Sequence, residues 1–174
     1  MTVQEIYAGG QRYTVSGGGY APHGEIFLDE QPVDLANTPT LYECLQAGLL
    51  CNDSHLKEED GNWVVVGSPT EGALVAVARK ASLTSQSLEQ TLPRLDTIPF
   101  ESQFQYMATL HGTRSERSIY VKGSAEAILK RCYQMLDTHG DRIAVNSKQI
   151  ERSVDEMAKQ GLRVLALAKK VVPR

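Results

Sequence analysis

The chain has 174 residues, of which 41% are hydrophobic and 22% charged, and this composition is typical of one globular domain. Its formal net charge is −3, which argues against a dedicated nucleic-acid-binding domain, because such domains usually carry an excess of basic residues. No apolar run approaches the roughly 20 residues of a membrane-spanning helix. The three cysteines, Cys44, Cys51 and Cys132, are too few and too scattered for a disulfide framework or a zinc site. We therefore expect a domain in a reducing, cytosolic setting.

The chain opens with two short β-like runs. Residues 2–8 and 11–15 flank Gly9 and Gly10, which predicts a hairpin with a two-residue turn. Glycines at 17–19 indicate a loop. Residues 25–33 are weakly patterned and predict at most a short strand followed by a connection.

A helix is expected next. Leu41, Cys44, Leu45 and Leu49 recur at helical spacing, with Pro39 in the first turn and Asn37 or Thr38 as the cap. The run then ends near Asn52 and Asp53, and residues 57–61 are expected to form a charged turn. The apolar sequence N-W-V-V-V at 62–66 predicts a strand that is buried on both faces.

Residues 67–81 predict a second helix. Ser68 stands at the N-cap, Pro69 at the first helical position and Glu71 three residues after the cap, which is the S-x-x-E pattern of a capping box. From this local pattern alone, Glu71 is a capping carboxylate.

The middle of the chain predicts a short helix at 84–92, a strand at 95–99 and a hairpin. Apolar residues alternate with others along 104–111, a turn follows at 112–116, and 117–121 form the return strand. This hairpin brings Lys122 near the Phe100 end of its partner. Lys122 and Gly123 stand where the strand gives way to a helix, a corner suited to a planar anionic ligand, although a lone lysine there also fits an ordinary surface position.

The last third predicts strands at 133–137 and 142–145, and a helix capped by Asn146 or Ser147 and ended by Gly161. V-L-A-L-A within 162–172 is typical of a central strand. The predicted fold class is α+β, with a mainly antiparallel sheet of about six or seven strands flanked by helices.

Four stretches in a fixed order resemble the nucleotide-binding domain of P-type cation-transporting ATPases, in particular the type II, calcium-pump-like members. They are G-S-P-T-E-G-A-L at 67–74, I-P-F-E-S-Q-F-Q-Y-M at 98–107, K-G-S-A-E at 122–126 and G-L-R-V-L-A at 161–166. The family patterns they resemble are G-D-P-T-E-x-A-L, P-F-x-S-x-x-K/R-x-M, K-G-A-P-E and G-L-R-x-L-A.

The resemblance implies that residues 1–174 form one nucleotide-binding domain of a larger pump. It implies that ATP, as Mg-ATP in the whole pump, is held by its adenine. The γ-phosphate is presented to an aspartate that is outside this chain. The implied partners are the phosphorylation and actuator domains of the same polypeptide, and the implied location is the cytoplasmic side of an integral membrane protein. The isolated domain is expected to bind ATP without hydrolysing it.

The resemblance also assigns roles to residues. Phe100 stacks on adenine, Glu71 accepts a hydrogen bond from the adenine amino group or a nearby water, and Lys122 lies deep against the purine. Gly123 lets the base approach the backbone, and Arg163 reaches the phosphates. The remaining wall and segment positions implied by the family are Thr70, Ser102, Gln105, Met107 and Leu165.

Four positions, in three of the stretches, depart from the family pattern. Ser68 replaces an acidic residue, Ala125 replaces a proline, and Gln105 and Ser102 stand where the family often has lysine or arginine. Weak phosphate contact leaves open an alternative, a non-catalytic regulatory or interaction module with the same fold. A free-standing hydrolase is not supported, because no nucleophile, base and oxyanion set is recognisable. His23, His55, His111 and His139 are expected at the surface.

Overall fold

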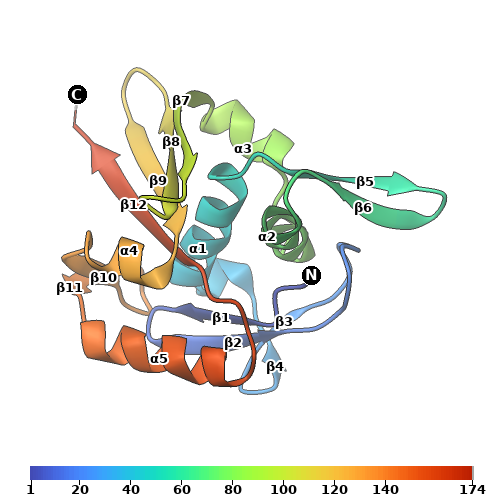
Figure 1. Ribbon diagram of the computed structural model, residues 1–174, viewed down its shortest axis with the longest axis horizontal. Helices are drawn as coiled ribbons and strands as arrows, with labels where there is room; N and C mark the ends of the chain where they lie inside the picture. Colours follow the sequence, from blue (N-terminus) through green and yellow to red (C-terminus); the bar gives the residue numbers. More distant parts are fainter. Residues whose placement is uncertain (174) are drawn as a thin grey trace.

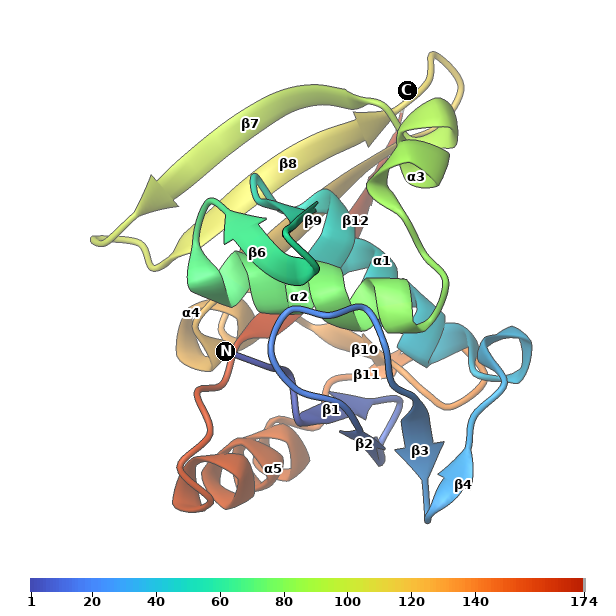
Figure 2. The same cartoon turned by 90° about the vertical axis from the view of Figure 1, so that its right-hand side faces the viewer.

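The computed structural model describes residues 1–173 and arranges them in layers (Figure 1). Figure 2 shows a four-stranded sheet uppermost, helices α1 (Pro39–Leu50) and α2 (Pro69–Lys80) in the middle, and a second four-stranded sheet beneath them. Helix α5 (Ser147–Lys159) lies on the outer side of that second sheet. The helix pair is therefore enclosed between two sheets.

The upper sheet carries two of the four stretches on which the resemblance rests, residues 98–107 and the start of 122–126. Its strand order is β12-β9-β8-β7, and every neighbouring pair is antiparallel. The bounds are β7 (Arg94–Glu101), β8 (Tyr106–Gly112), β9 (Arg117–Gly123) and β12 (Ala166–Val172). The predicted hairpin is β8–β9, and Met107 lies opposite Lys122 in its register.

The lower sheet is formed by the first 32 residues in simple sequential order. Its strands are β1 (Glu5–Ala8), β2 (Gln11–Val15), β3 (Ile26–Leu28) and β4 (Gln31–Pro32). Gly9 and Gly10 both adopt positive φ angles, 62° and 78°, which a two-residue hairpin turn requires and which glycine adopts without strain. The predicted first hairpin is confirmed.

Each sheet encloses its own hydrophobic core against the helix pair. The upper core joins α1 and α2 to β8 and β9, and its buried members are Ala47, Leu49, Leu50, Cys51, Val75, Ala78, Leu88, Met107 and Tyr120. The lower core joins the same helices to β1, β2 and β3, with Ile6, Ala8, Tyr13, Ile26, Leu41, Leu45 and Val77. A helix that is apolar on more than one face is buried on more than one face, and this explains the composition of α1 and α2.

Helix α1 begins as predicted at Pro39, and of the two expected caps it is Thr38 that occupies the N-cap position. Thr38 makes no side-chain hydrogen bond to the helix, and Asn37 belongs to a preceding 3₁₀ turn, η1 (Leu35–Asn37). The Asp34 carboxylate caps that turn by accepting the N–H of Ala36 at 3.0 Å. Proline at the first position leaves one fewer donor to satisfy, so the helix starts without a side-chain cap.

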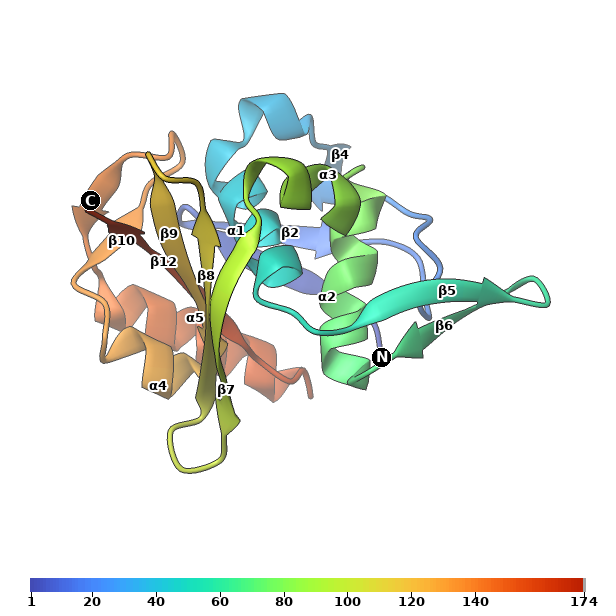
Figure 3. The same ribbon diagram turned by 90° about the horizontal axis from the view of Figure 1, so that it is seen from above.

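The strand predicted at 62–66 is confirmed, but its burial on both faces and the charged turn predicted at 57–61 are wrong. Strands β5 (His55–Glu59) and β6 (Asn62–Val66) form a separate two-stranded hairpin that projects from the body, as Figures 1 and 3 show. Only Asp60 and Gly61 form the turn. Val66 is 38% exposed. One side of the hairpin packs on α2, and Gly72 accommodates Val65 there, so the valine run covers a helix instead of filling a sheet.

The remaining predicted elements are present. They are α3 (Ser85–Thr91), α4 (Ala125–Leu129), β10 (Gln134–Leu136) and β11 (Arg142–Ala144), the last two paired as a small hairpin. Asn146 caps α5 through a bond from the N–H of Gln149, and Gly161 adopts φ 80° after the helix, as expected. The α+β class with antiparallel sheets and flanking helices is confirmed. Across residues 1–173 the strands number twelve, in four sheets.

Strand β12 lies at an edge of the upper sheet, which corrects the central position predicted for it. It pairs only with β9 among the strands within residues 1–173. The opposite edge is β7, where Pro99 lacks a backbone donor and the register with β8 shifts twice, between Arg94 and Asp96 and between Ile98 and Glu101. The apolar pattern of residues 164–168 reflects packing against α1 and α4.

His111 is buried, at 2% exposure, which contradicts the prediction that all four histidines lie at the surface. Its Nδ1 lies 3.0 Å from the Leu92 carbonyl oxygen and its Nε2 lies 2.8 Å from Thr109 Oγ1. The ring also meets Tyr120 edge-on, with centroids 5.6 Å apart. On β8 it is the face carrying Met107, Thr109 and His111 that turns to the core.

We expect the folded state to lose stability as the pH falls below about 6.5, the ordinary pKa of histidine. Burial lowers the pKa of His111, and its bond to the Leu92 carbonyl only partly opposes this. The unfolded chain therefore binds the proton first, so the stability present above pH 6.5 declines towards the lowered native pKa. Urea unfolding at pH 7.5 and 5.5 tests this, with His111→Gln as the control. An equal pH dependence in both proteins would contradict it.

Candidate functional site

Glu71 stands in the first turn of α2 and points away from the helix end it was predicted to cap. Ser68 occupies the N-cap without a side-chain bond, and its own N–H donates to Ser54 Oγ at 2.9 Å. The Glu71 carboxylate accepts the N–H of Asp53 at 3.1 Å and the hydroxyl of Ser54 at 3.3 Å. The capping box predicted from S-x-x-E is therefore wrong, because the carboxylate has partners far away in the sequence.

The strongest of those partners is Lys122. Its Nζ lies 2.6 Å from Glu71 Oε2 and donates to the Cys51 carbonyl, also at 2.6 Å. The side chains of Lys122 and Glu71 are 8% and 16% exposed. An ammonium group is buried at this depth only when it is paired, so the ion pair and the carbonyl together hold it there.

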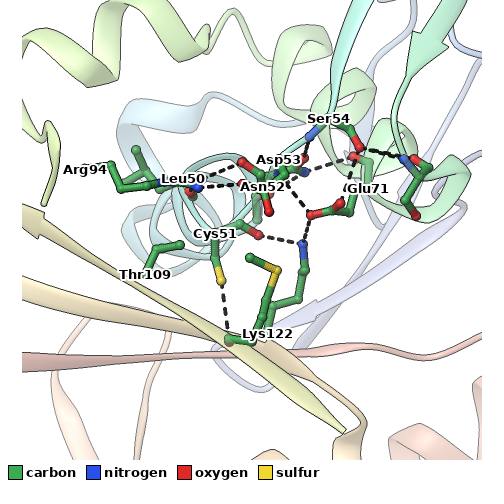
Figure 4. A network of polar contacts seen from close by, with 12 residues as sticks. Leu50, Cys51, Asn52, Asp53, Ser54, Glu71, Arg94, Thr109 and Lys122 are labelled. Carbon is green, nitrogen blue, oxygen red and sulfur yellow. Dashed lines mark hydrogen bonds and ion pairs between the residues drawn. The ribbon is translucent and has the colours of Figure 1, made fainter. Parts of the chain in front are cut away.

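The loop after α1, residues 51–54, connects these groups (Figure 4). Asn52 accepts the N–H of Ser54 at 2.8 Å and donates its amide to Gly48 O and Glu71 O at 3.0 and 2.9 Å. Burial raises the pKa of the Cys51 thiol, and the nearby Lys122 only partly opposes this. The loop presents one carbonyl to the lysine, and one N–H and one hydroxyl to the carboxylate.

Arg94, the first residue of β7, holds the same loop from the other side. Its guanidinium contacts Asp53 Oδ1 at 2.5 Å, Asn52 O at 2.6 Å and Leu50 O at 3.1 Å. Figure 4 shows Arg94 and Glu71 on opposite sides of residues 52–54. The loop thus joins the end of α1 to the upper sheet and to α2.

The predicted site residues on β7 and β8 lie at one end of the upper sheet. Glu101, Tyr106 and Gly123 are register partners across β7, β8 and β9, so Phe100 lies at the same end as Lys122. Phe100 is 59% exposed. Met107 is buried opposite Lys122.

Ser102 and Gln105 stand in the exposed turn between β7 and β8. Gln105 Oε1 accepts the hydroxyl of Ser124 at 3.2 Å, and Ser124 in turn caps α4. The glutamine that replaces a basic residue of the family pattern is therefore hydrogen-bonded to the turn between β9 and α4.

Gly123 is explained by the backbone. A Cβ atom there would collide with the Gln105 carbonyl and with Tyr106, so the close pairing of β9 with the end of β8 already requires glycine. Arg163 and Leu165 lie in the extended segment before β12, whose first residue pairs with Gly123. Arg163 is exposed and has no ion-pair partner within residues 1–173. The Thr70 hydroxyl lies 3.5 Å from Met1 Sδ.

Sequence reasoning missed Cys51, Asn52, Asp53, Ser54 and Arg94. The signal was C-N-D-S directly after an apolar helix, where Asn, Asp and Ser side chains commonly bond to nearby backbone groups. That pattern indicates a turn, but it does not show that the side chains of Glu71 and Lys122 contact the turn.

No helix within residues 1–173 has the length and apolar character needed to cross a bilayer. No group of three or more His, Cys, Asp or Glu side chains there is arranged to hold a metal ion.

Comparison with known proteins gives one family. The family model described as "P-type ATPase, cytoplasmic domain N" matches residues 40–174. The chain is 51% identical to the cation-transporting ATPase pma1 of Synechocystis sp., an alignment covering 99% of this chain and 19% of that protein. It is 36% identical to the probable cation-transporting ATPase F of Mycobacterium tuberculosis, covering 95% and 18%.

The calcium-transporting ATPase type 2C member 1 of Bos taurus is 34% identical, over 97% of this chain and 18% of that protein. The chain thus spans less than a fifth of the length of each of these relatives. The family model covers most of the chain, including the segments that contain Glu71 and Lys122. The alignments with the relatives cover nearly the whole chain. The chain belongs to the P-type ATPase cytoplasmic N domain family.

Proposed function

We propose that this domain binds ATP by its adenine and presents the γ-phosphate to an aspartate on another domain of a cation-transporting pump. The observation that carries the proposal is the buried Lys122–Glu71 pair at the end of the sheet where Phe100 is 59% exposed. A flat exposed ring offers a stacking surface for any base, and the Glu71 carboxylate offers an acceptor for an amino group.

Few cationic side chains of this domain would contact the phosphates of ATP. Arg163 is the proposed contact, because it is exposed and lacks an ion-pair partner within residues 1–173, whereas Gln105 is engaged with Ser124. Magnesium would be held by the phosphates and by the phosphorylation domain. We expect weak affinity, about 0.1 mM to several mM, corresponding to roughly −5.5 to −3 kcal/mol. Tethering within the whole pump raises the effective concentration and compensates for this.

The whole protein is proposed to be a membrane-embedded, ATP-driven cation transporter of the calcium type, in which this domain lies on the cytoplasmic side. The proposal draws on the names of the relatives, among which calcium-transporting ATPases occur. The partners in this proposal are the phosphorylation and actuator domains of the same polypeptide. The domain alone would bind ATP without hydrolysing it.

Titration of the domain with ATP and with adenosine, followed by amide chemical shifts, tests the proposal. Shifts are expected around Glu71, Phe100, Lys122 and Gly123 with either ligand, and around Arg163 with ATP alone. If several mM ATP changes the amide chemical shifts at none of these positions, the alternative is favoured, an interaction module without useful nucleotide binding.

Phe100→Ala is expected to weaken ATP binding by about 1–3 kcal/mol, because the base loses its stacking partner. The ring is 59% exposed, so its removal should cost little stability. The binding constant comes from the same titration. Leu95→Ala is the matched control, since Leu95 is a 47% exposed apolar residue of the same strand. Unchanged affinity in Phe100→Ala would show that the ring does not contact the base.

A further inference from the structure

Three hydrogen bonds restrain the orientation of the Glu71 carboxylate. Oε2 accepts from the Asp53 N–H and from Lys122 Nζ, and Oε1 accepts from the Ser54 hydroxyl. A carboxylate has about four lone-pair sites, so these three donors leave one acceptor site, on Oε1. That site accepts an N–H and repels a carbonyl oxygen.

We propose that Ser54 and Arg94 are positioning residues that make this pocket select a purine with a 6-amino group over one with a 6-oxo group. The inference rests on the proposed function. A 6-aminopurine donates an N–H to the remaining Oε1 site, whereas a 6-oxopurine brings an oxygen to it and leaves the carboxylate unpaired. Discrimination of this kind depends on a carboxylate that cannot turn away.

Ser54 restrains the Oε1 atom of the Glu71 carboxylate. The serine oxygen accepts the Ser68 N–H at 2.9 Å, and its own proton has two acceptors in reach, Glu71 Oε1 at 3.3 Å and the Ser68 carbonyl oxygen at 3.5 Å. The charged carboxylate is the closer and stronger of the two. Ser54 is 8% exposed, and its N–H is bound to Asn52 Oδ1, so the hydroxyl keeps one position. Without the hydroxyl, Oε1 has two open sites and the terminal torsion of Glu71, which is intrinsically broad, loses its restraint.

Arg94 holds the loop that carries these donors. Its three contacts to Leu50, Asn52 and Asp53 are charge-assisted and leave the guanidinium side chain 32% exposed, at the rim of the molecule. The planar fork reaches the two carbonyls and the carboxylate together, which a lysine ammonium group cannot reproduce. Loss of the fork frees the Asp53 N–H and Ser54 together.

A cavity of about 290 Å³ lies on the Arg94 side of the loop, lined by Asp53, Glu89, Arg94 and His111 among others. Because this space borders the loop opposite Glu71, residues 52–54 can relax into it once Arg94 is replaced. The positioning is therefore supplied by the arginine and not by close packing.

The test compares ATP with inosine triphosphate, its 6-oxo analogue, in amide-shift titrations of the wild-type domain, Ser54→Ala and Arg94→Lys. We expect the wild type to bind ATP about 10-fold more tightly, the scale of one charge-assisted hydrogen bond. In both variants the ratio should fall towards one, through weaker ATP binding and nearly unchanged inosine triphosphate binding. Arg79→Lys is the matched control: Arg79 is on α2 but packs over Trp63, 4.8 Å from the ring centroid, and the ratio should stay at the wild-type value.

Urea unfolding of each variant accompanies the titrations, and Arg94→Lys carries the test if Ser54→Ala does not fold. A lower stability with an unchanged ratio would mean a purely structural role and overturn the inference, as would a wild-type domain that binds both nucleotides equally. A wild-type domain that binds neither nucleotide would overturn the proposed function, and the inference with it. The first two results leave ATP binding itself in place, so the two failures are distinguishable.

Discussion

Replacing Lys122 by methionine is expected to lower the free energy of unfolding by about 3–5 kcal/mol, the cost of leaving one member of a buried ion pair without its partner. Methionine keeps the length of the apolar stem but removes the ammonium group that bonds Glu71 and the Cys51 carbonyl at 2.6 Å each. The carboxylate then remains buried against a thioether. Urea unfolding at pH 7.5 measures the loss through the midpoint at constant m-value.

Two companion variants separate the ion pair from other effects. Adding Glu71→Gln to Lys122→Met removes the second charge, and we expect it to recover more than half of the loss. Lys57→Met is the surface control, because Lys57 is 52% exposed and its pair with Glu59 is worth about 1 kcal/mol or less. An unchanged unfolding midpoint in Lys122→Met would show that the pair contributes no net stability.

Leu41→Ala is expected to destabilise the domain by about 2–5 kcal/mol. Leu41 is fully buried in the lower core, between α1 and the sheet formed by β1, β2 and β3, where it is part of the hydrophobic cluster. Leu95→Ala, the same chemical change at a 47% exposed position, should stay within about 0.5 kcal/mol of the wild type. Equal effects at the two positions would contradict the two-core architecture.

The β8–β9 hairpin could be predicted because local rules and the tertiary fold agree there. Alternation along 104–111, a polar turn and a return strand identify an antiparallel pair, and the register then places Met107 opposite Lys122. The strand-to-helix corner at Lys122, Gly123 and Ser124 followed from the same pattern. The resemblance implied that Lys122 and Glu71 both contact the adenine, but their direct ion pair was not predicted and could not be read from spacing.

Three errors share one physical cause, the competition between local and distant partners. Glu71 matches a capping box, but a buried ammonium group and the 51–54 loop bind its carboxylate more strongly than its own helix end does. The valines of β6 look like a central strand, but a helix covers one side of a two-stranded hairpin. His111 looks like a turn residue, yet Leu92 and Thr109 satisfy both of its nitrogens inside the core.

The lower sheet was only partly predictable. Its first hairpin has a clear glycine turn, whereas β3 and β4 have three and two residues and almost no periodicity. Arg94 illustrates the same limit for the site: a single arginine at the start of a strand carries no local signal, and its three acceptors lie more than 40 positions earlier in the chain.

The two edges of the upper sheet have a consequence for solubility at high concentration. Along β7, Pro99 and the two register shifts interrupt the row of backbone donors that an incoming strand would need. Along β12, the exposed Lys169 and Lys170 bring like charges together when two copies approach edge to edge. Although Leu95 and Ile98 are exposed on the β7 edge, neither edge is a ready template for intermolecular strand addition, and the domain is protected against amyloid-like polymerisation through this sheet.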